Sequence, residues 1–346
     1  MQRVLPAEWY PQSGVMLTWP HPYGDWAPWL NQVEQVYLDL SRAITRSEQL
    51  LVVCFDDQHQ RHIRTILNRA GIALDRVVFR NLPSNDSWAR DHGPITILAD
   101  GKPRLMDFGF NGWGQKYAAT LDDLLSLRLY AEKTFADIDI ESSGLILEGG
   151  SIDSDGQGTL LTTENCLLTP TRNPHLDKAA IEQILHDLLG VDRVLWLAEG
   201  ELRGDDTDSH IDMLARFCDP ATIAYTACEN PADEHYAGLA RMQAELEKLT
   251  DRNGKPYKLI PLPIPDPIYN AEGDRLPGSY ANFLIINKQV LVPTYRDKRD
   301  QTALHRLREC FPNHEVVGID CQPLIEQFGS LHCITMQLPQ GVLRAG

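Results

Sequence analysis

The sequence predicts an α/β protein assembled from several copies of one strand-and-turn unit. Strand-length apolar runs recur along the chain, amphipathic helical segments lie between them, and two segments repeat the same order of turns and strands. Strands that alternate with helices are typical of the α/β class. The composition is that of a folded chain, because 43% of the 346 residues are apolar and 23% are charged, unlike disordered or collagen-like sequences.

The predicted strands are apolar runs that end at turn residues. In chain order they cover residues 49–55, 94–98, 144–152, 158–161, 165–169, 191–197, 221–226, 283–286 and 290–293. The predicted helices carry apolar side chains at helical spacing, as with Leu30, Val33 and Tyr37 on one face of the first. They cover residues 29–46, 57–70, 178–189, 234–249 and 302–310.

Two segments, residues 150–172 and 278–296, repeat the order turn, strand, tight turn, strand and proline. Weaker copies elsewhere bring the number to five, and the copies begin near residues 91, 149, 210, 280 and 331. Units of this size fill the chain, and each repeated unit packs against its neighbours. We therefore expect residues 1–346 to form a single domain of five pseudo-symmetric units rather than two independent domains.

Charge and cysteine content argue against several kinds of partner. The chain has 32 Lys and Arg against 48 Asp and Glu, a net charge of −16, which repels nucleic acid and anionic membranes and attracts small cations. Its seven cysteines include no Cys-x-x-Cys pair, which favours free thiols in the cytoplasm over a zinc site or a disulfide framework. We expect no signal peptide and no membrane span. The oligomeric state, a homo-oligomer included, stays open.

Chemically reactive side chains gather where the repeated units begin. Loops at one end of a repeated scaffold converge on its axis, so we expect these side chains to share one site. They are Asp91, Glu148, His210, Asp212, Asn282 and Cys333.

Cys333 lies between a Gly329–Ser330 turn and a short apolar strand. A free cysteine commonly packs as a small buried hydrophobe, and that interpretation stays open for Cys333 alone. A nucleophilic cysteine needs a nearby cation that lowers its pKa, together with some exposure. The junction of a loop and a strand can provide that exposure.

The segment around His210 offers two interpretations. His210 and Asp212 are two residues apart, so on a strand they would point to one face. Asp205, Asp206 and Asp208 precede them. These carboxylates form either a solvated turn or the divalent-metal site of a metallohydrolase, although the sequence contains no His-Glu-x-x-His motif.

Trp88 and Glu148 suit a buried cation. Trp88 precedes Asp91 in a loop that Gly93 and Pro94 end; it either anchors the loop or, beside a carboxylate, stacks on a delocalised cation such as guanidinium. Glu148 stands between an apolar strand and two glycines, which desolvates it unless a cation is near. Together with a cysteine and a histidine, these carboxylates could hold a planar cation and attack it with sulfur.

Five segments form an ordered set of motifs. They read Trp88-Ala89-Arg90-Asp91-His92-Gly93-Pro94, Glu148-Gly149-Gly150, Asp206-Thr207-Asp208-Ser209-His210-Ile211-Asp212, Ser279-Tyr280-Ala281-Asn282-Phe283 and Leu331-His332-Cys333-Ile334-Thr335. In order, they resemble the motifs of the agmatine deiminase and bacterial (Porphyromonas-type) peptidylarginine deiminase family, over residues 19–339. The resemblance implies the pentein fold, or α/β propeller: five pseudo-symmetric ββαβ-type units around a central active site. Ser209 and residues 328–331 depart from the glycine-richer family pattern, which concerns local loop shape.

The resemblance implies a cysteine mechanism. Asp91 and Asp212 would hold the guanidinium N–H groups while Cys333 attacks the central carbon. His210 would protonate the departing ammonia and later take a proton from the water that hydrolyses the S-alkylthiouronium intermediate.

The remaining roles follow from the same resemblance. Glu148 would orient His210 and raise its pKa, while Trp88 and Asn282 would line the substrate. No metal and no cofactor is expected. The implied reaction converts agmatine, a small cationic guanidino compound, to N-carbamoylputrescine and ammonia, a step toward putrescine.

Other interpretations stay open beside this reaction. In the first, the substrate is free or peptidyl arginine and the cysteine mechanism is the same. In the second, the chain is a metal-dependent hydrolase that uses residues 205–212. In the third, it binds polyamines without catalysis. No cluster of basic residues stands ready for the carboxylate of arginine. Asp86, Asp205 and Asp206 are candidates for the ammonium end of agmatine.

Overall fold

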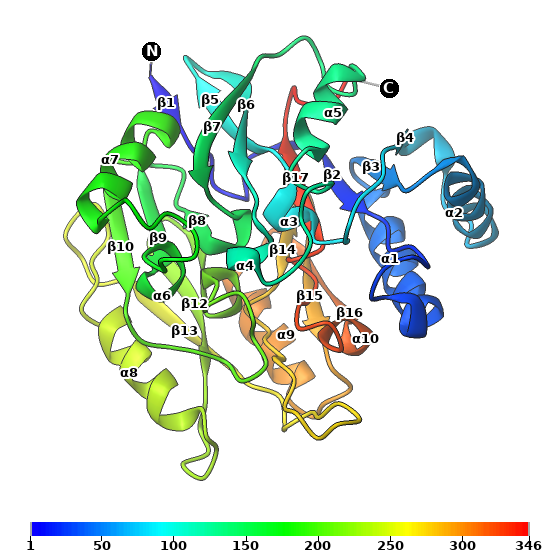
Figure 1. Ribbon diagram of the computed structural model, residues 1–346. Helices are drawn as coiled ribbons and strands as arrows, with labels where there is room; N and C mark the ends of the chain where they lie inside the picture. The colour runs from blue at the N-terminus through cyan, green and yellow to red at the C-terminus, as the bar shows by residue number, and fades with distance from the viewer. Residues whose placement is uncertain (1, 345–346) are drawn as a thin grey trace.

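Five β-sheets of three or four strands make up the core, and the longer helices lie outside them (Figure 1). The computed structural model describes residues 2–344. The strand orders are β1-β5-β6-β7, β10-β9-β8, β11-β12-β13, β14-β15-β16 and β17-β2-β3-β4. Each three-stranded sheet contains one antiparallel pair and one parallel pair. Each four-stranded sheet adds one pair to this pattern, β1 with β5 antiparallel in one sheet and β3 with β4 parallel in the other. The five ββαβ units that the sequence predicts are therefore confirmed.

The elements follow one another unit by unit. The first unit has β2 (Gln12–Thr18), η1 (Ala27–Trp29), α1 (Leu30–Ile44), β3 (Gln49–Cys54), α2 (Asp57–Arg69), η2 (Leu74–Arg76) and β4 (Val77–Asn81). The second has α3 (Ala89–His92), β5 (Ile95–Ala99), β6 (Lys102–Gly109), α4 (Gly112–Gln115), α5 (Leu125–Ala131) and β7 (Ile140–Ile146), with β1 (Arg3–Val4) at its edge. The third has η3 (Gly149–Ser151), β8 (Ile152–Ser154), β9 (Thr159–Thr163), α6 (Glu164–Leu167), α7 (Lys178–Leu189) and β10 (Arg193–Leu197).

The last two units repeat the pattern. The fourth has η4 (Ile211–Met213), β11 (Ala215–Asp219), β12 (Thr222–Ala227), α8 (Tyr236–Leu246) and β13 (Lys258–Pro263). The fifth has β14 (Leu284–Ile286), β15 (Gln289–Thr294), α9 (Asp300–Cys310), β16 (Glu315–Asp320) and α10 (Gln322–Ile325). The final strand, β17 (Thr335–Pro339), pairs antiparallel with β2 and completes the first sheet.

Local sequence explains where the helices begin and end. Helix α7 occupies the predicted residues because the Asp177 side chain accepts a hydrogen bond from the Ala180 N–H, and Gly190 ends the helix at a φ of 72°. Helix α2 begins in the same way, with Asp56 accepting from the His59 N–H. The other three predicted helices are also present, with ends shifted by a few residues.

Two of the nine predicted strands are wrong over most of their length, and so is the expectation that His210 and Asp212 lie on a strand. Residues 144–152 contain the end of β7, a loop and η3, and residues 165–169 fall largely in α6, which the Thr163 side chain caps by accepting from the Cys166 N–H. His210 and Asp212 lie at η4 and not on a strand. The alignment of the two repeated segments is also displaced by one strand. It pairs residues 158–161, which fall largely in β9, with residues 283–286, which fall largely in β14, whereas the structural counterpart of β14 is β8.

Strand β8 has only three residues and contains Asp153. It therefore has no apolar run by which the sequence could reveal it.

The five segments that lead into the hairpins meet in the middle of the molecule. We call them the lead-in segments: residues 88–92, 148–151, 210–213, 279–282 and 330–334. Backbone hydrogen bonds join segments that are distant in sequence, from the Arg90 N–H to the Cys333 carbonyl and from the His332 N–H to the Asn282 carbonyl. Residues from all five units therefore converge here. The single-domain prediction for residues 1–346 stays a prediction.

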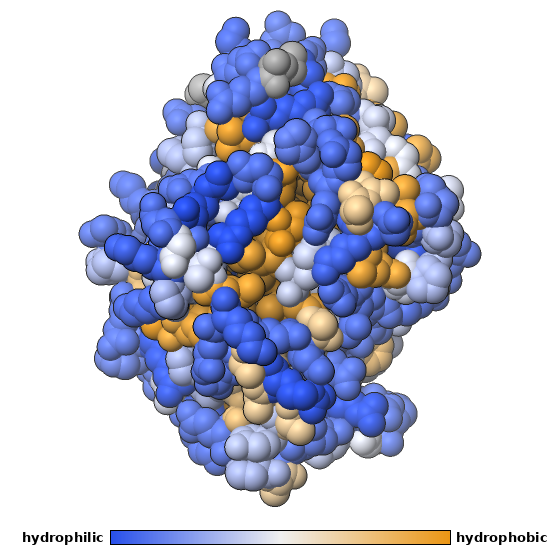
Figure 2. All heavy atoms as spheres, turned by 90° about the vertical axis from the view of Figure 1, so that its left-hand side faces the viewer, coloured by the Kyte–Doolittle hydropathy of each residue, from blue (hydrophilic) through white to orange (hydrophobic). Residues whose placement is uncertain are grey.

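The outer surface is mostly polar. Figure 2 shows the side of the molecule that faces left in Figure 1, where apolar side chains gather in a hollow among polar ones. A groove on the outside of the third unit is lined by Leu145, Leu176, Ile184 and Leu188. Within residues 2–344, no helix combines the length and the apolar character needed to cross a membrane.

Candidate active site

The lead-in segments bring together all six of the polar side chains predicted to share a site. Each of the six side chains belongs to a residue that is at most 5% exposed. They are Asp91 in α3, Glu148 before η3, His210 before η4, Asp212 within η4, Asn282 before β14 and Cys333 before β17.

Gly150 explains how side chains from different units approach so closely. A Cβ atom on Gly150 would lie 2.6 Å from Nδ1 of His210, 2.8 Å from Oδ1 of Asp91 and 3.2 Å from Oδ2 of Asp212. Its N–H also donates to Oδ1 of Asp91 at 2.9 Å. A side chain at this position would therefore separate the three groups.

The thiol of Cys333 lies against an amide and a carboxylate. Nδ2 of Asn282 donates to Sγ at 3.3 Å, and Oδ2 of Asp212 lies 3.7 Å from Sγ. Burial, followed by the negative charges of Asp212 and Asp91, raises the pKa of the Cys333 thiol well above its ordinary value. A cation between these carboxylates would offset their charge and favour the thiolate.

The two aspartates have different surroundings. Both oxygens of Asp91 accept hydrogen bonds, from the Gly150 N–H and from Nε1 of Trp113, each at 2.9 Å. Burial raises the pKa of Asp91 to about 6. Oδ2 of Asp212 accepts from Nδ1 of His332 at 2.8 Å. Although burial of Asp212 opposes ionisation, His332 lowers the pKa of this carboxyl.

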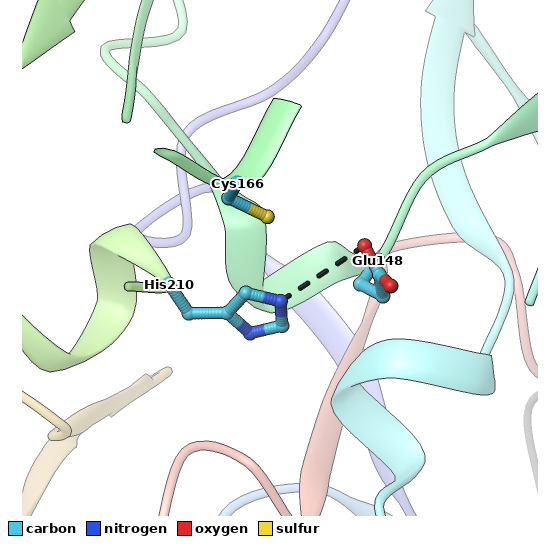
Figure 3. Close-up of side chains that lie close together, drawn as sticks. All are labelled: Glu148, Cys166 and His210. Atoms are coloured by element: carbon cyan, nitrogen blue, oxygen red, sulfur yellow. Dashed lines mark ion pairs between the residues drawn. The ribbon is translucent and has the colours of Figure 1, made fainter. Parts of the chain in front are cut away.

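His210 is surrounded by acidic and thiol groups (Figure 3). Nδ1 lies 3.7 Å from Oδ1 of Asp91, and Nε2 lies 3.9 Å from Oε2 of Glu148. Burial disfavours the charged ring, but Asp91, Cys166 and Glu148 outweigh it and raise the pKa of His210 well above its ordinary value. The sequence interpretation assigns this effect to Glu148, whereas Asp91 contributes more.

Glu148 is held from its other side by Arg172. Nε of Arg172 lies 2.9 Å from both carboxylate oxygens, and neither side chain is exposed. Arg172 also donates to Oδ2 of Asp208 at 2.6 Å and to the Thr207 carbonyl. Sequence reasoning missed Arg172 as a site residue, although it ends one of the two clearest repeat copies.

One group of side chains has the ligand atoms of a metal site. Glu148, Cys166 and His210 each offer one such atom, all within 4.8 Å of one another (Figure 3). These are ligand types that zinc accepts. Both oxygens of Glu148, however, already accept from Arg172, and the positive charge of that guanidinium opposes a second cation.

The aspartates before His210 do not form a metal cluster. Asp205 accepts hydrogen bonds from the backbone and hydroxyl of Thr207 and from the Ser209 N–H. Asp208 pairs with Lys116 and Arg172. In the described part of the chain, these aspartates are in no group of three close ligand side chains. They stabilise the loop that leads to His210.

A narrow pocket that is open to solvent ends at Cys333. Trp88 and Asp91 also line it, whereas Glu148, His210, Asp212 and Asn282 are not among the lining residues. The full set is Asp25, Asp86, Trp88, Asp91, Trp113, Tyr117, Asp206, Thr207, Gln327, Phe328, Gly329 and Cys333. Within residues 2–344, the lining contains four aspartates and no lysine or arginine.

Two tryptophans form one wall of this pocket. Trp88 packs edge-on against Trp113, with ring centroids 6.5 Å apart. A Cβ atom on Gly329 would overlap the ring of Trp88, so the backbone before Cys333 passes directly over the indole. Sequence reasoning missed Trp113. It lies between two glycines and has a φ of 54°, a left-handed conformation that marks a constrained turn.

The nearby arginines point away from the pocket. Arg90 is buried and lies 3.7 Å from Glu8. Arg203 is largely exposed and pairs with Glu234. Neither therefore offers a cation for a substrate carboxylate.

Comparison with known proteins identifies the family. Residues 4–339 match the model of the family described as Porphyromonas-type peptidyl-arginine deiminase. A solved structure from Porphyromonas gingivalis, described as a "Putative Arginine Deiminase", is 49% identical, with a TM-score of 0.92 over 99% of this chain and 100% of that chain.

Two further solved structures are agmatine deiminases. That of C. jejuni, a cysteine-to-serine variant with substrate bound, is 38% identical, with a TM-score of 0.91 over 99% of this chain and 97% of that chain. That of Enterococcus faecalis is 32% identical, with a TM-score of 0.88 over 97% of this chain and 96% of that chain. The chain therefore belongs to the Porphyromonas-type peptidyl-arginine deiminase family.

Proposed function

We propose that this protein is an agmatine deiminase that converts agmatine and water to N-carbamoylputrescine and ammonia. The charge of the pocket carries the proposal: Asp91 lies beside Cys333 at the buried end, and Asp25, Asp86 and Asp206 line the rest. Agmatine has a guanidinium at one end and an ammonium at the other, so both of its ends would meet carboxylates. Arginine adds a carboxylate, which would lose its water and meet like charge.

The first half of the reaction depends on the bound cation. A guanidinium between Asp91 and Asp212 offsets the charges that keep the Cys333 thiol protonated, and the thiol releases its proton to solvent. Sγ then bonds to the guanidinium carbon. His210, charged at the start, gives its proton to the departing nitrogen. The C–N bond breaks, ammonia leaves, and an S-alkylthiouronium remains on Cys333.

The second half returns the protein to its starting state. His210, now neutral, takes a proton from a water molecule that attacks the same carbon. The C–S bond breaks, the second proton of the water moves from oxygen to sulfur and restores the thiol, and N-carbamoylputrescine leaves. Glu148, held by Arg172, supports the charged form of His210 in each cycle.

Ammonia release from agmatine, free arginine and an arginine peptide tests the proposal. We expect kcat/KM for agmatine to exceed that for arginine by at least about a hundredfold. Cys333→Ala should lose at least about a thousandfold, and Cys228→Ser, at a cysteine outside the pocket, should stay active. Iodoacetamide should inactivate the wild type and EDTA should not.

Arginine is the second candidate substrate, because the 49% identical P. gingivalis protein is described as a "Putative Arginine Deiminase". Arginine turnover within about tenfold of agmatine would favour it. Full activity in Cys333→Ala would overturn the cysteine mechanism for either substrate.

A further inference from the structure

Behind the site lies a cluster of buried charges, of which the proposed reaction uses only Asp212. Its members come from the N-terminal segment, from three lead-in segments and from strands β8 and β11, and none is more than 7% exposed. They are Glu8, Arg90, Asp153, Asp212, Arg216 and His332. Asp212 belongs both to this cluster and to the candidate active site, so it joins the two.

His332 is the link between Asp212 and the rest of the cluster. Its Nδ1 lies 2.8 Å from Oδ2 of Asp212, and its Nε2 lies 2.7 Å from Oε2 of Glu8. Both ring nitrogens thus face carboxylate oxygens, and only the doubly protonated ring can donate to both. His332 itself is 2% exposed.

Glu8 is held firmly in its place. Its Oε2 accepts from Nη2 of Arg216 at 2.8 Å and its Oε1 accepts from the Ile285 N–H at 2.6 Å. Although burial works against ionisation, Arg216 and His332 hold the pKa of Glu8 well below its usual range. The ring of His332 is therefore fixed at Nε2 by an anion that is itself fixed by two donors.

Asp212 depends on His332 for its orientation. Apart from the Cys333 thiol at 3.7 Å, its carboxylate accepts a hydrogen bond only from His332 among the described residues. Oδ1 is buried and has no partner there, which leaves it for a ligand N–H. Asp91, by contrast, is oriented by Gly150 and Trp113.

We propose that His332 is a positioning residue, which fixes Asp212 through Nδ1 so that Oδ1 is directed at the guanidinium of the substrate. This rests on the proposed function in one respect, that Asp212 holds a guanidinium. Sequence reasoning assigned no role to His332, although it precedes Cys333.

Two substitutions separate the bonds of the ring. The amide nitrogen in His332→Asn takes the place of Nδ1 and can still donate to Asp212, but the side chain is too short to reach Glu8. His332→Gln places its amide nitrogen near Nε2, where it can donate to Glu8 but not to Asp212. Each variant loses one bond of the same kind, so a merely structural role would affect both similarly.

We expect His332→Asn to retain kcat/KM within about tenfold of wild type, and His332→Gln to lose at least about a hundredfold with a raised KM. Thermal unfolding of both variants supplies the stability control. Equal losses of activity, or losses that follow the melting temperatures, would overturn the proposal.

A second readout does not require turnover. Millimolar guanidinium ion should change the rate at which iodoacetamide alkylates Cys333 in wild type and in His332→Asn, because a bound cation offsets the carboxylate charges and lies next to the sulfur. The rate should change much less in His332→Gln. An equal change in the two variants would also overturn the positioning role. If the rate changes in wild type but no ammonia is released from agmatine, the proposed function fails while the positioning role stands.

Discussion

Cys333 carries a thiol that the free protein holds in its protonated form. The groups responsible, besides burial, are the carboxylates of Asp212 and Asp91, and these are the groups that a guanidinium would neutralise. In the proposed mechanism the substrate itself would therefore generate the thiolate that attacks it. A thiol that stays protonated until the cation arrives is also less open to alkylation and oxidation.

Asp212→Asn should therefore change turnover and thiol reactivity in opposite directions. Loss of the carboxylate leaves the guanidinium with one anionic partner, which should cost on the order of 3 to 5 kcal/mol in kcat/KM. The same change lowers the pKa of Cys333, so iodoacetamide at pH 8 should alkylate it faster. Mass spectrometry of the labelled peptide measures the rate. The exposed Asp137→Asn variant is the control, and slower alkylation in Asp212→Asn would contradict this account.

The pH dependence should report Asp91. Its pKa is raised to about 6 by burial, so the carboxyl is protonated below that pH and can no longer pair with a cation. We expect kcat/KM to fall as the pH drops through about 6, because this parameter follows the free enzyme. The corresponding limb of kcat should lie at lower pH, since a bound guanidinium favours the ionised carboxylate. A kcat/KM that stays flat down to pH 4 would exclude Asp91 from binding.

At the scale of elements, the side chains of the candidate active site are carried by short turns and not by the strands of the sheets. The lead-in segments are single helical turns or tight turns, which present several side chains to one point. At Gly150, three functional groups surround the place that a Cβ atom would occupy. Their spacing therefore depends on the absence of a side chain.

Gly150→Ala should reduce kcat/KM by at least about a hundredfold, because the methyl group displaces His210, Asp91 or Asp212 from its position. Gly150 does not have a positive φ, so the loss would come from crowding and not from backbone strain. Gly144→Ala is the matched control, since nothing lies within 4 Å of its Cβ position. Wild-type initial rates in Gly150→Ala would show that the spacing of these groups is not critical.

Local patterns predicted the elements that local forces determine. Amphipathic spacing locates α2 and α7, and the apolar runs locate β3 and β10. The same patterns failed for β8, whose three residues include Asp153 and Ser154, and for α6, whose residues suit a strand as well as a helix. Hydrogen bonds to a cap, which no periodicity records, decide such cases.

The convergence of the six polar side chains of the candidate site could be predicted because each of them lies at the start of a repeated unit. Arg172, Trp113, His332 and Glu8 were missed because each acts through a partner far away in sequence. Glu8, for example, contacts His332 across 324 positions. Such pairings become visible only once the five units are placed around a common centre.

At the scale of the whole molecule, the pairing of β17 with β2 joins the two ends of the chain. Thr335 pairs with Leu17, and Cys333 lies two residues before that strand. The position of Cys333, the proposed nucleophile, thus depends on the pairing of β2, near the start of the chain, with β17, the last described strand. Pairings of this range form slowly, because the intervening chain must be ordered first.

Because β17 leaves the ribosome after the other described strands, a nascent chain can complete most of its sheets before the sulfur is in place. Catalytic competence would then arise only after β17 has been made and has paired with β2. Refolding from denaturant should reproduce this delay, with far-ultraviolet circular dichroism recovering before ammonia release. Simultaneous recovery of both signals would mean that the ends join early. The deiminase would then become active as soon as its secondary structure forms, with no delay between folding and the first ammonia release.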